Sequence, residues 1–181
     1  RINRDLGPTN AYLQSLEVSD GFSLEPSFTR GILEYSVTVP YGTTSLTVTG
    51  IKADTNATME PENGVVTVNG LKVGEEQTAT ITVTSEDSNV TNEYKVKVLR
   101  QSNVATLSGL TTSTGSLSPA FNASTMSYTV TVPYATTSLT VTGTKADANA
   151  TMTPSDGKLS FTGLSVGTSS EQTIKVTSQD G

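Results

Sequence analysis

The stretch of sequence that decides the fold is YSVTVPYGTTSLTVTGIKADTNATM, residues 35–59, which returns as YTVTVPYATTSLTVTGTKADANATM at residues 128–152. The offset is 93 residues, and the copies differ only at Ser36/Thr129, Gly42/Ala135, Ile51/Thr144 and Thr55/Ala148. A repeat of this period indicates two copies of one structural unit. We therefore expect tandem domains whose cores are built from matched positions.

Polar and apolar residues alternate within each copy. Tyr35, Val37 and Val39 are separated by polar residues, and Leu46 and Val48 continue the alternation after a break. Such a period of two is typical of half-buried strands, because successive side chains point to opposite faces of a strand. The break at residues 40–44 begins with proline and contains small residues, which allow the chain to turn. This pattern predicts two strands joined as a hairpin.

Further alternating segments extend each repeat to about seven short strands. In the first repeat, Asn63-Gly64 is a strong tight-turn signal ahead of residues 65–68, and alternating runs follow at residues 80–83 and 94–98. Turns at these intervals are typical of a β-sandwich, and no segment has a helical period. The predicted fold is all-β. The side chains expected in the two cores are Phe28/Phe121, Tyr35/Tyr128, Val37/Val130, Val39/Val132, Leu46/Leu139, Val48/Val141, Ile81/Ile174 and Val83/Val176.

The repeat also predicts where the domains begin and end. We assign residues 11–100 to the first repeat and 101–181 to the second, with residues 1–10 as the tail of a preceding repeat and a linker. Arg1–Arg4 match Lys97–Arg100, the end of the first repeat. The second repeat stops before the counterpart of that last strand, so we expect it to be truncated, with an unpaired edge along residues 173–178. We interpret the chain as part of a longer protein with neighbouring repeats.

The amino-acid composition and net charge exclude some classes of binding partner. Only 34% of the 181 residues are hydrophobic, whereas 33 are Thr and 22 are Ser, which suits sheets that bury one face and expose the other to water. The net charge is −6 and no basic patch is present, so nucleic acid is not expected as a partner. No apolar run is long enough to cross a bilayer, so no membrane insertion is expected.

The sequence offers few candidates for catalytic residues. The chain has no His and no Cys, which excludes an imidazole base, a thiolate nucleophile and thiolate metal sites. The best carboxylate cluster is Asp54, Glu60 and Glu62, but the matched second-repeat residues are Asp147, Thr153 and Ser155. Since only one carboxylate is shared, solvated acidic loops are the better interpretation. We predict that the chain is not an enzyme.

Calcium is the second candidate chemistry. Asp54-Thr55-Asn56 and Asp147-Ala148-Asn149 each offer two oxygen-bearing side chains of the kind that Ca²⁺ binds. The ion takes six to eight oxygen ligands, which neither triplet supplies. Asp and Asn in such triplets commonly bond their own backbone and hold a turn. We therefore predict no metal and no cofactor.

Exposed aromatic rings are the third candidate. Tyr41 and Tyr134 follow proline in the predicted turns, where a ring could stack on a sugar or pack at an interface. Alternatively each ring caps its own sandwich, and both interpretations stay open. Two weaker features are four glycosylation sequons, at Asn56, Asn89, Asn122 and Asn149, and an isopeptide bond through Lys52 or Lys145. Chance explains the sequons in so Thr-rich a chain, and nothing singles out the buried acid that an isopeptide bond requires.

The order of motifs resembles a known family. Each repeat runs Leu-x-Pro-x-Phe, Tyr-x-Val-x-Val-Pro, Leu-x-Val-x-Gly and Ile-x-Val-Thr-x-x-Asp, with small departures, and the first closes on Tyr-x-Val-x-Val-x-Arg. This order resembles the cadherin-like β-sandwich domain of bacterial surface proteins, in full over residues 13–100 and without the last strand over residues 107–180. The resemblance implies immunoglobulin-like sandwiches used as tandem modules in large secreted or surface-anchored proteins, with no catalytic residues.

That resemblance sets the functional expectation. We expect a non-catalytic spacer, presentation stalk or adhesion module, located outside the cell and facing a protein, a cell-wall surface or a polysaccharide. The alternative is a carbohydrate-binding accessory module attached to an enzyme that acts on polysaccharides. The rings of Tyr41 and Tyr134 would carry that alternative.

Overall fold

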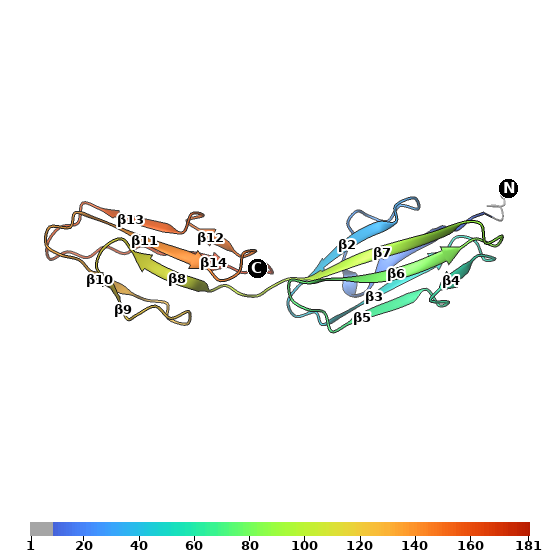
Figure 1. Ribbon diagram of the computed structural model, residues 1–181, viewed down its shortest axis with the longest axis horizontal. Coiled ribbons are helices and arrows are strands. Elements are labelled where there is room, and N and C mark those ends of the chain that lie inside the picture. The colour runs from blue at the N-terminus through green and yellow to red at the C-terminus, as the bar shows by residue number, and fades with distance from the viewer. Residues whose placement is uncertain (1–8) are drawn as a thin grey trace. The chain divides into compact units, whose positions relative to one another are not determined.

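The computed structural model describes residues 9–181, which divide into a first compact unit ending at Gln101 and a second unit, Ser102–Gly181 (Figure 1). The expected match of Arg1–Arg4 to a strand end lies outside the described residues. The first unit contains β1 (Leu13–Val18), η1 (Ser19–Gly21), β2 (Glu34–Val39), β3 (Ser45–Lys52), β4 (Thr58–Glu60), β5 (Val65–Asn69), β6 (Glu76–Thr84) and β7 (Thr91–Arg100). The second contains β8 (Leu107–Thr112), β9 (Ser116–Ser118), β10 (Thr129–Thr131), β11 (Ser138–Lys145), β12 (Thr151–Thr153), β13 (Lys158–Thr162) and β14 (Lys175–Thr177). Within residues 9–181, no helix has the length and apolar character needed to cross a membrane.

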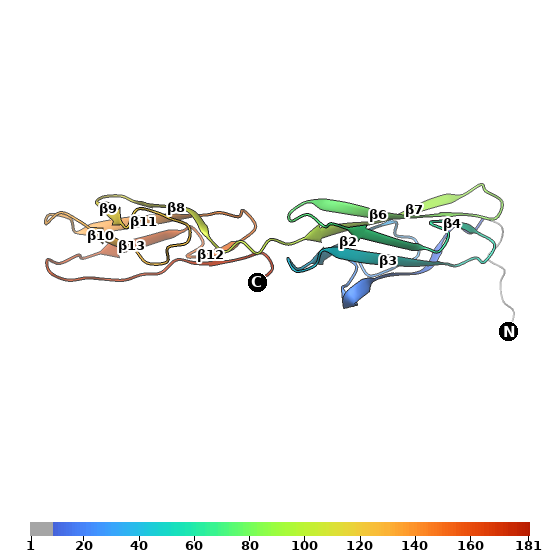
Figure 2. The same ribbon diagram turned by 90° about the horizontal axis from the view of Figure 1, so that it is seen from below.

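The first unit is a sandwich of two sheets. One sheet has the order β1-β3-β5 and the other has the order β2-β7-β6-β4, and Figure 2 shows β6 and β7 side by side in the second of these. β7 is central to its sheet, because it pairs with β2 in parallel and with β6 in antiparallel orientation. The predicted all-β sandwich is therefore present, and β7 is the strand that joins β2 to the rest of its sheet.

The predicted hairpin between residues 35–39 and 46–49 is wrong. β2 pairs with β7, whereas β3 pairs with β1 and β5, so these two consecutive strands belong to different sheets. The turn between them, closed by a 3.0 Å bond from the Thr43 N–H to the Pro40 carbonyl, carries the chain from one sheet to the other. Alternation shows that each strand has one buried face, but it does not distinguish strands that pair at their edges from strands that face each other across a core.

The core of the first unit follows the sequence pattern. The predicted residues of β2, β3 and β6 are all at most 2% exposed, namely Tyr35, Val37, Val39, Leu46, Val48, Ile81 and Val83. Phe28 is half-buried and stacks on the Tyr35 ring with a centroid distance of 6.2 Å. The Tyr35 hydroxyl lies 2.8 Å from the Thr29 carbonyl oxygen and 2.9 Å from that of Ile32, either of which can accept its proton, so its polar end is satisfied while its ring is buried.

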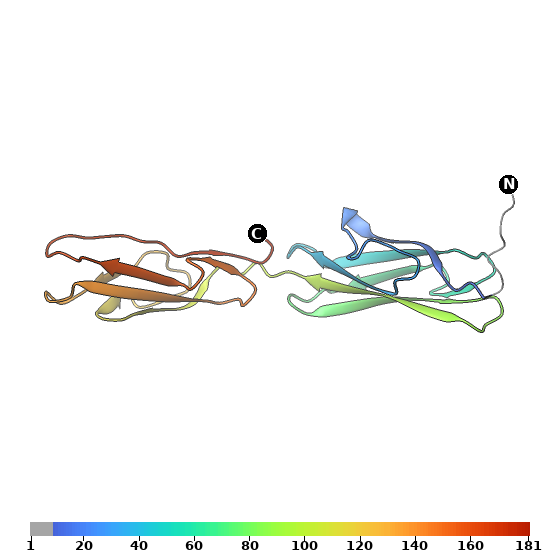
Figure 3. The same ribbon diagram turned by 90° about the horizontal axis from the view of Figure 1, so that it is seen from above.

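The second unit repeats only one of the two sheets. Its sheet β13-β11-β8 matches β5-β3-β1, with the same antiparallel pairings. The other sheet consists of two separate pairs, β10 with β9 and β12 with β14. The segment before β14 is a thin tube in Figure 3, whereas the matched residues of the first unit belong to the nine-residue β6. Among the described residues, β14 has no strand partner besides β12.

The predicted core of the second unit is only partly correct. Leu139 and Val141 are buried, at 8% and 7% exposure, together with Leu159. The other predicted residues are half-buried: Phe121, Tyr128, Val130, Val132, Ile174 and Val176. In the first unit, β7 inserts Tyr94, Val96 and Val98 between β2 and β6, each at most 1% exposed. The matched side chains of β10 and β14 lack those neighbours, so their burial was wrongly predicted.

Candidate functional site

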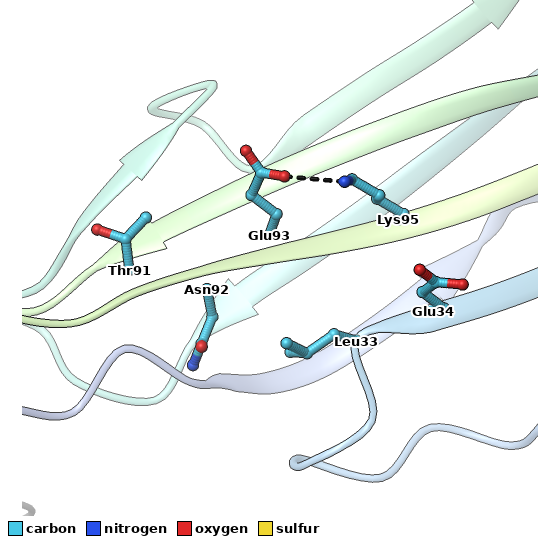
Figure 4. A pocket seen from close by; sticks show the side chains of 6 residues that line it. All are labelled: Leu33, Glu34, Thr91, Asn92, Glu93 and Lys95. Carbon is cyan, nitrogen blue, oxygen red and sulfur yellow. Dashed lines mark ion pairs between the residues drawn. The ribbon is translucent and has the colours of Figure 1, made fainter.

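A shallow recess of about 420 Å³ lies beside β2 and β7 (Figure 4). Its charged groups are already paired: the Glu93 and Lys95 side chains are 2.9 Å apart, and the hydrogen bond from Lys95 to Glu93 raises the pKa of that lysine. The residues that line it are Leu33, Glu34, Thr91, Asn92, Glu93 and Lys95. Exposed ion pairs of this kind contribute little to stability and offer no activated group. The recess therefore provides a surface without evident chemistry.

The acidic residues singled out in the sequence do not assemble into a metal site. Among residues 9–181, no group of three or more Asp, Glu, His or Cys side chains is close enough to hold an ion. Asp54 accepts the N–H of Asn56 at 3.0 Å, and Asp147 accepts that of Asn149 at 2.8 Å. Both triplets thus form the self-bonded turns that the sequence indicated.

The lysines considered for an isopeptide bond have a different role. The ammonium of Lys52 donates to the Ala57 carbonyl, and that of Lys145 donates to the Ala148 and Ala150 carbonyls. Ala57 and Ala150 are buried, at 1% and 2% exposure, so each lysine satisfies a carbonyl beside the end of the core. This bond repeats in both units and closes the loop that follows β3 or β11. The four sequon asparagines are all exposed.

Tyr41 and Tyr134 occupy matched turns but have different surroundings. Arg100, the last residue of β7, lies over the Tyr41 ring with its guanidinium carbon 4.8 Å from the centroid. The same side chain donates to the carbonyls of Tyr41, at 2.7 Å, and Leu71, at 2.8 Å. Tyr41 is 39% exposed, whereas Tyr134 is 87% exposed. The Tyr41 ring is therefore partly covered by Arg100 of its own sandwich, and the Tyr134 ring is open.

Sequence reasoning missed Arg100 as the partner of Tyr41. The signal was present, because Arg100 ends the only strand of the first repeat that has no counterpart in the second. A cation placed over an aromatic face is attracted by the ring quadrupole, and its N–H groups can bond nearby carbonyls at the same time. The ring and the two carbonyls together form what we call the arginine socket: the Tyr41 ring and the carbonyl oxygens of Tyr41 and Leu71.

The turn between β6 and β7 contains a carboxyl group, that of Asp87, whose pKa is lowered by its hydrogen bonds. Ser85, 2% exposed, donates its hydroxyl to Asp87 at 2.7 Å and accepts the Val90 N–H at 3.0 Å. This bond from Ser85, followed by bonds from the side chain and N–H of Asn89, lowers the pKa of Asp87. A carboxyl whose pKa is lower in the folded state stabilises the fold above its ordinary pKa of about 4, and this contribution is lost as the pH falls through the lowered value.

Replacing Ser85 with alanine should therefore raise the pKa of Asp87 and weaken the first unit at neutral pH. Loss of the acceptor for the Val90 N–H alone should cost about 1 kcal/mol. An NMR pH titration of carboxyl carbons measures the pKa, and denaturation at pH 7 and pH 3 measures the stability. The loss should be smaller at pH 3. Ser178→Ala is the matched control, since Ser178 bonds Asp180 in the second unit. An unchanged Asp87 pKa would show that Ser85 is not the cause.

Comparison with known proteins identifies the family. The model of the cadherin-like beta sandwich domain matches residues 13–101 and again residues 107–181. The chain belongs to this family. Both units are thus cadherin-like domains, and the resemblance seen in the motifs is confirmed. No curated protein matches the chain.

A structural comparison adds one distant likeness. A crystal structure described as that of a candidate glycoside hydrolase from Bacteroides thetaiotaomicron is 21% identical and aligns with a TM-score of 0.35. The alignment covers 58% of this cadherin-like chain and 30% of the other chain. A likeness this low carries no argument about what the cadherin-like units do.

Proposed function

We propose that the chain is a non-catalytic spacer and presentation module of a secreted or cell-surface protein. The observation that carries this proposal is the tandem repetition of one cadherin-like domain. Repetition of a folded unit adds length and surface without adding chemistry. The location rests on the motif order, which resembles that of bacterial surface proteins.

The internal structure of the first unit supports a passive role. Its core is completed by its own strands, from Leu13 of β1 to Val98 of β7, each 0% exposed. The polar groups of the Ser85 turn and of the Lys52 loop have structural hydrogen-bond partners. A module whose core and loops are held by its own residues can be repeated without requiring a ligand in every copy.

A display experiment tests the spacer. The whole chain is inserted between a cell-wall anchor and an epitope, and antibody access is compared with a fusion that lacks the chain and with a Gly/Ser linker of equal length. We expect the chain to raise antibody access and to keep the epitope attached during protease treatment, whereas the flexible linker is cleaved. Equal antibody access with and without the chain would contradict the proposal.

A second candidate is carbohydrate binding, and the exposed ring of Tyr134 is the observation that favours it. An open aromatic face is a suitable platform for a sugar ring. Against it, the matched Tyr41 ring is covered by Arg100, so the repeat does not provide two equivalent platforms. A pull-down with insoluble polysaccharides separates the candidates. Retention that Tyr134→Ala abolishes and Tyr41→Ala leaves unchanged would favour binding, whereas a pure spacer should not be retained.

A further inference from the structure

The first unit contains two Asn-Gly dipeptides, at residues 63–64 and 69–70, and the sequence has no others. In such a dipeptide the backbone nitrogen of glycine can attack the side-chain amide of asparagine, because glycine has no side chain to obstruct the approach and its backbone rotates easily. The second unit has no amide at the matched positions, which are Asp156-Gly157 and Thr162-Gly163. Since both dipeptides carry the same chemistry, the fold decides which of them reacts.

The Asn63-Gly64 turn is held by hydrogen bonds in an arrangement that opposes this attack. The Gly64 N–H donates to the Pro61 carbonyl at 2.8 Å, so the nitrogen cannot give up its proton without losing that bond. The Asn63 Oδ1 accepts the Val65 N–H at 3.1 Å, so the side-chain amide cannot rotate toward the nitrogen without losing another. Gly64 is also buried. Breaking these bonds adds to the barrier.

The Asn69-Gly70 dipeptide has no such restraints. Asn69 is the last residue of β5, and both residues are exposed to solvent. Among residues 9–181, no group accepts a hydrogen bond from the Gly70 N–H, and none bonds the side-chain amide of Asn69. Nothing lies within 4 Å of the place that a Cβ of Gly70 would occupy. The amide and the nitrogen that attacks it are therefore both free to move.

The reaction needs only the chain and water. The Gly70 nitrogen gives its proton to solvent and forms a bond to the Asn69 Cγ, while the bond from Cγ to the side-chain nitrogen breaks and that nitrogen leaves as ammonia with a proton from solvent. One water molecule then opens the five-membered imide. Attack of water at Cγ gives aspartate, and attack at the main-chain carbonyl carbon gives isoaspartate, whose backbone runs through Cβ and Cγ. Neither step requires an oxidant or a reductant.

The reactive dipeptide adjoins the arginine socket. Leu71 follows it and is 3% exposed. Its N–H donates to the Thr44 carbonyl at 2.9 Å, and its carbonyl accepts a hydrogen bond from Arg100 at 2.8 Å. Isoaspartate lengthens the backbone by one atom ahead of Gly70, which moves Leu71 against these fixed partners. Aspartate adds a negative charge but leaves the backbone length unchanged.

We propose that Asn69 is a self-modification site of the folded chain, at which the side-chain amide is converted to aspartate and isoaspartate, whereas the fold protects Asn63. The substrate is the chain's own amide, and water is the co-reactant. The isoaspartate product loosens the arginine socket and thereby limits the chemical lifetime of the first unit. The second unit has Thr162 at this position and keeps its turn. This modification goes beyond the proposed spacer function.

Tandem mass spectrometry of the full chain tests the site. Conversion of the amide replaces NH2 by OH, and the fragment masses assign this change to a residue. One sample is kept folded at mildly alkaline pH and a second is kept in concentrated urea. In the folded chain, Asn69 should react at least about tenfold faster than Asn63, because the hydrogen bonds around Asn63 and Gly64 have to open first. In urea, where neither turn is formed, the two rates should agree within about twofold.

Two variants provide matched controls for the chemistry. Asn69→Thr introduces the residue that the second unit has at this position, and it should abolish the reaction at this turn while leaving the rate at Asn63 unchanged. Gly70→Ala keeps the amide but places a methyl group beside the attacking nitrogen. It should slow the reaction at Asn69 about tenfold, since the added Cβ obstructs the approach and restricts the backbone.

The isoaspartate form of the chain tests the consequence for the arginine socket. It is separated from the unmodified chain by ion exchange and identified by methylation with a protein isoaspartyl methyltransferase. The first unit of this form should unfold at a lower denaturant concentration, and its NMR signals from Leu71 and Arg100 should shift. Asn69→Asp is the control, because it adds the same charge to an ordinary backbone. Its unfolding midpoint should stay close to that of the unmodified chain.

Three outcomes would overturn the proposal. The first is an equal rate at Asn63 and Asn69 in the folded chain, which would show that the fold protects neither. The second is an unreactive Asn69 in the folded chain over a period in which the sample in urea reacts. The third is an isoaspartate form as stable as Asn69→Asp, which would remove the effect on the arginine socket. Antibody access and polysaccharide retention are separate readouts, so failure here leaves the spacer test unaffected.

Discussion

Replacing Gly64 with alanine should lower the free energy of unfolding of the first unit by roughly 3 kcal/mol or more. Gly64 has a φ of +67°, a conformation that disfavours any side chain, and its carbonyl accepts the Gly50 N–H at 2.8 Å. An added Cβ would lie 2.2 Å from the Gly50 carbonyl oxygen and 2.7 Å from the Met59 methyl carbon. The nearer of these two atoms belongs to the backbone of β3. The turn can therefore make room for the added methyl group only by breaking the hydrogen bond between the Gly50 N–H and the Gly64 carbonyl.

The control for this substitution is Gly70→Ala. Gly70 has nearly the same φ, +64°, but nothing lies within 4 Å of its added Cβ. It should therefore show the backbone cost alone, about 1–2 kcal/mol. Denaturant unfolding followed by NMR signals of each unit provides the measurement, since the chain has no Trp. Gly157→Ala and Gly163→Ala repeat the comparison in the second unit. Equal losses at Gly64 and Gly70 would show that the close approach to Gly50 is unimportant.

Replacing Ile81 with alanine should cost the first unit about 2–5 kcal/mol, whereas Ile174→Ala should cost the second unit less than half as much. Ile81 is 1% exposed and packs across the core against Gly50 of β3, so its removal leaves a cavity between the sheets. Ile174 makes the matched approach to Gly143, but it is half-buried, and water can fill the space. Urea unfolding of each variant, resolved by unit, measures both losses. Equal losses would mean that the second core is as closed as the first.

The sequence was sufficient for the strands and insufficient for their pairing. The alternation of β2 and β3 placed their buried faces correctly, because period two depends only on the local backbone. It could not show that Pro40–Thr44 crosses between sheets, since a turn from one sheet to another and a hairpin turn use the same residue types. The partner of β2 is β7, more than 50 residues later in the chain, and such distant pairing leaves no local signal.

The core of the second unit shows a different limit of predicting burial from sequence. Val37 and Val130 occupy matched positions in nearly identical stretches, yet one is 2% exposed and the other is half-buried. Their environments differ because β7 covers only the first. The missing strand was visible in the sequence, but matched positions were nevertheless expected to have matched burial. Burial depends on what packs against a strand as well as on its own pattern.

Tyr41 and Tyr134 illustrate the same point at the candidate site. Both were predicted as ligand or interface aromatics, and both alternatives were left open. The structure shows Arg100 over the Tyr41 ring and Tyr134 exposed, so contact with its own sandwich describes the first copy only. Whether Tyr134 contacts a ligand stays a prediction. The residue that distinguishes the copies is Arg100, and its role follows from the position at which β7 ends.

The difference between the nine-residue β6 and the three-residue β14 should appear in amide hydrogen exchange. β6 pairs with β7 along its whole length and with β4 at Thr82–Thr84, so its amides that bond to these neighbours should exchange only when the whole first unit opens. Those at residues 169–174 lack a strand partner and should exchange within the native state. Proteases need the same local opening, so a first cut is expected ahead of β14. The second repeat should therefore lose its structure first at residues 169–174. The first repeat should resist proteolysis until it unfolds as a whole.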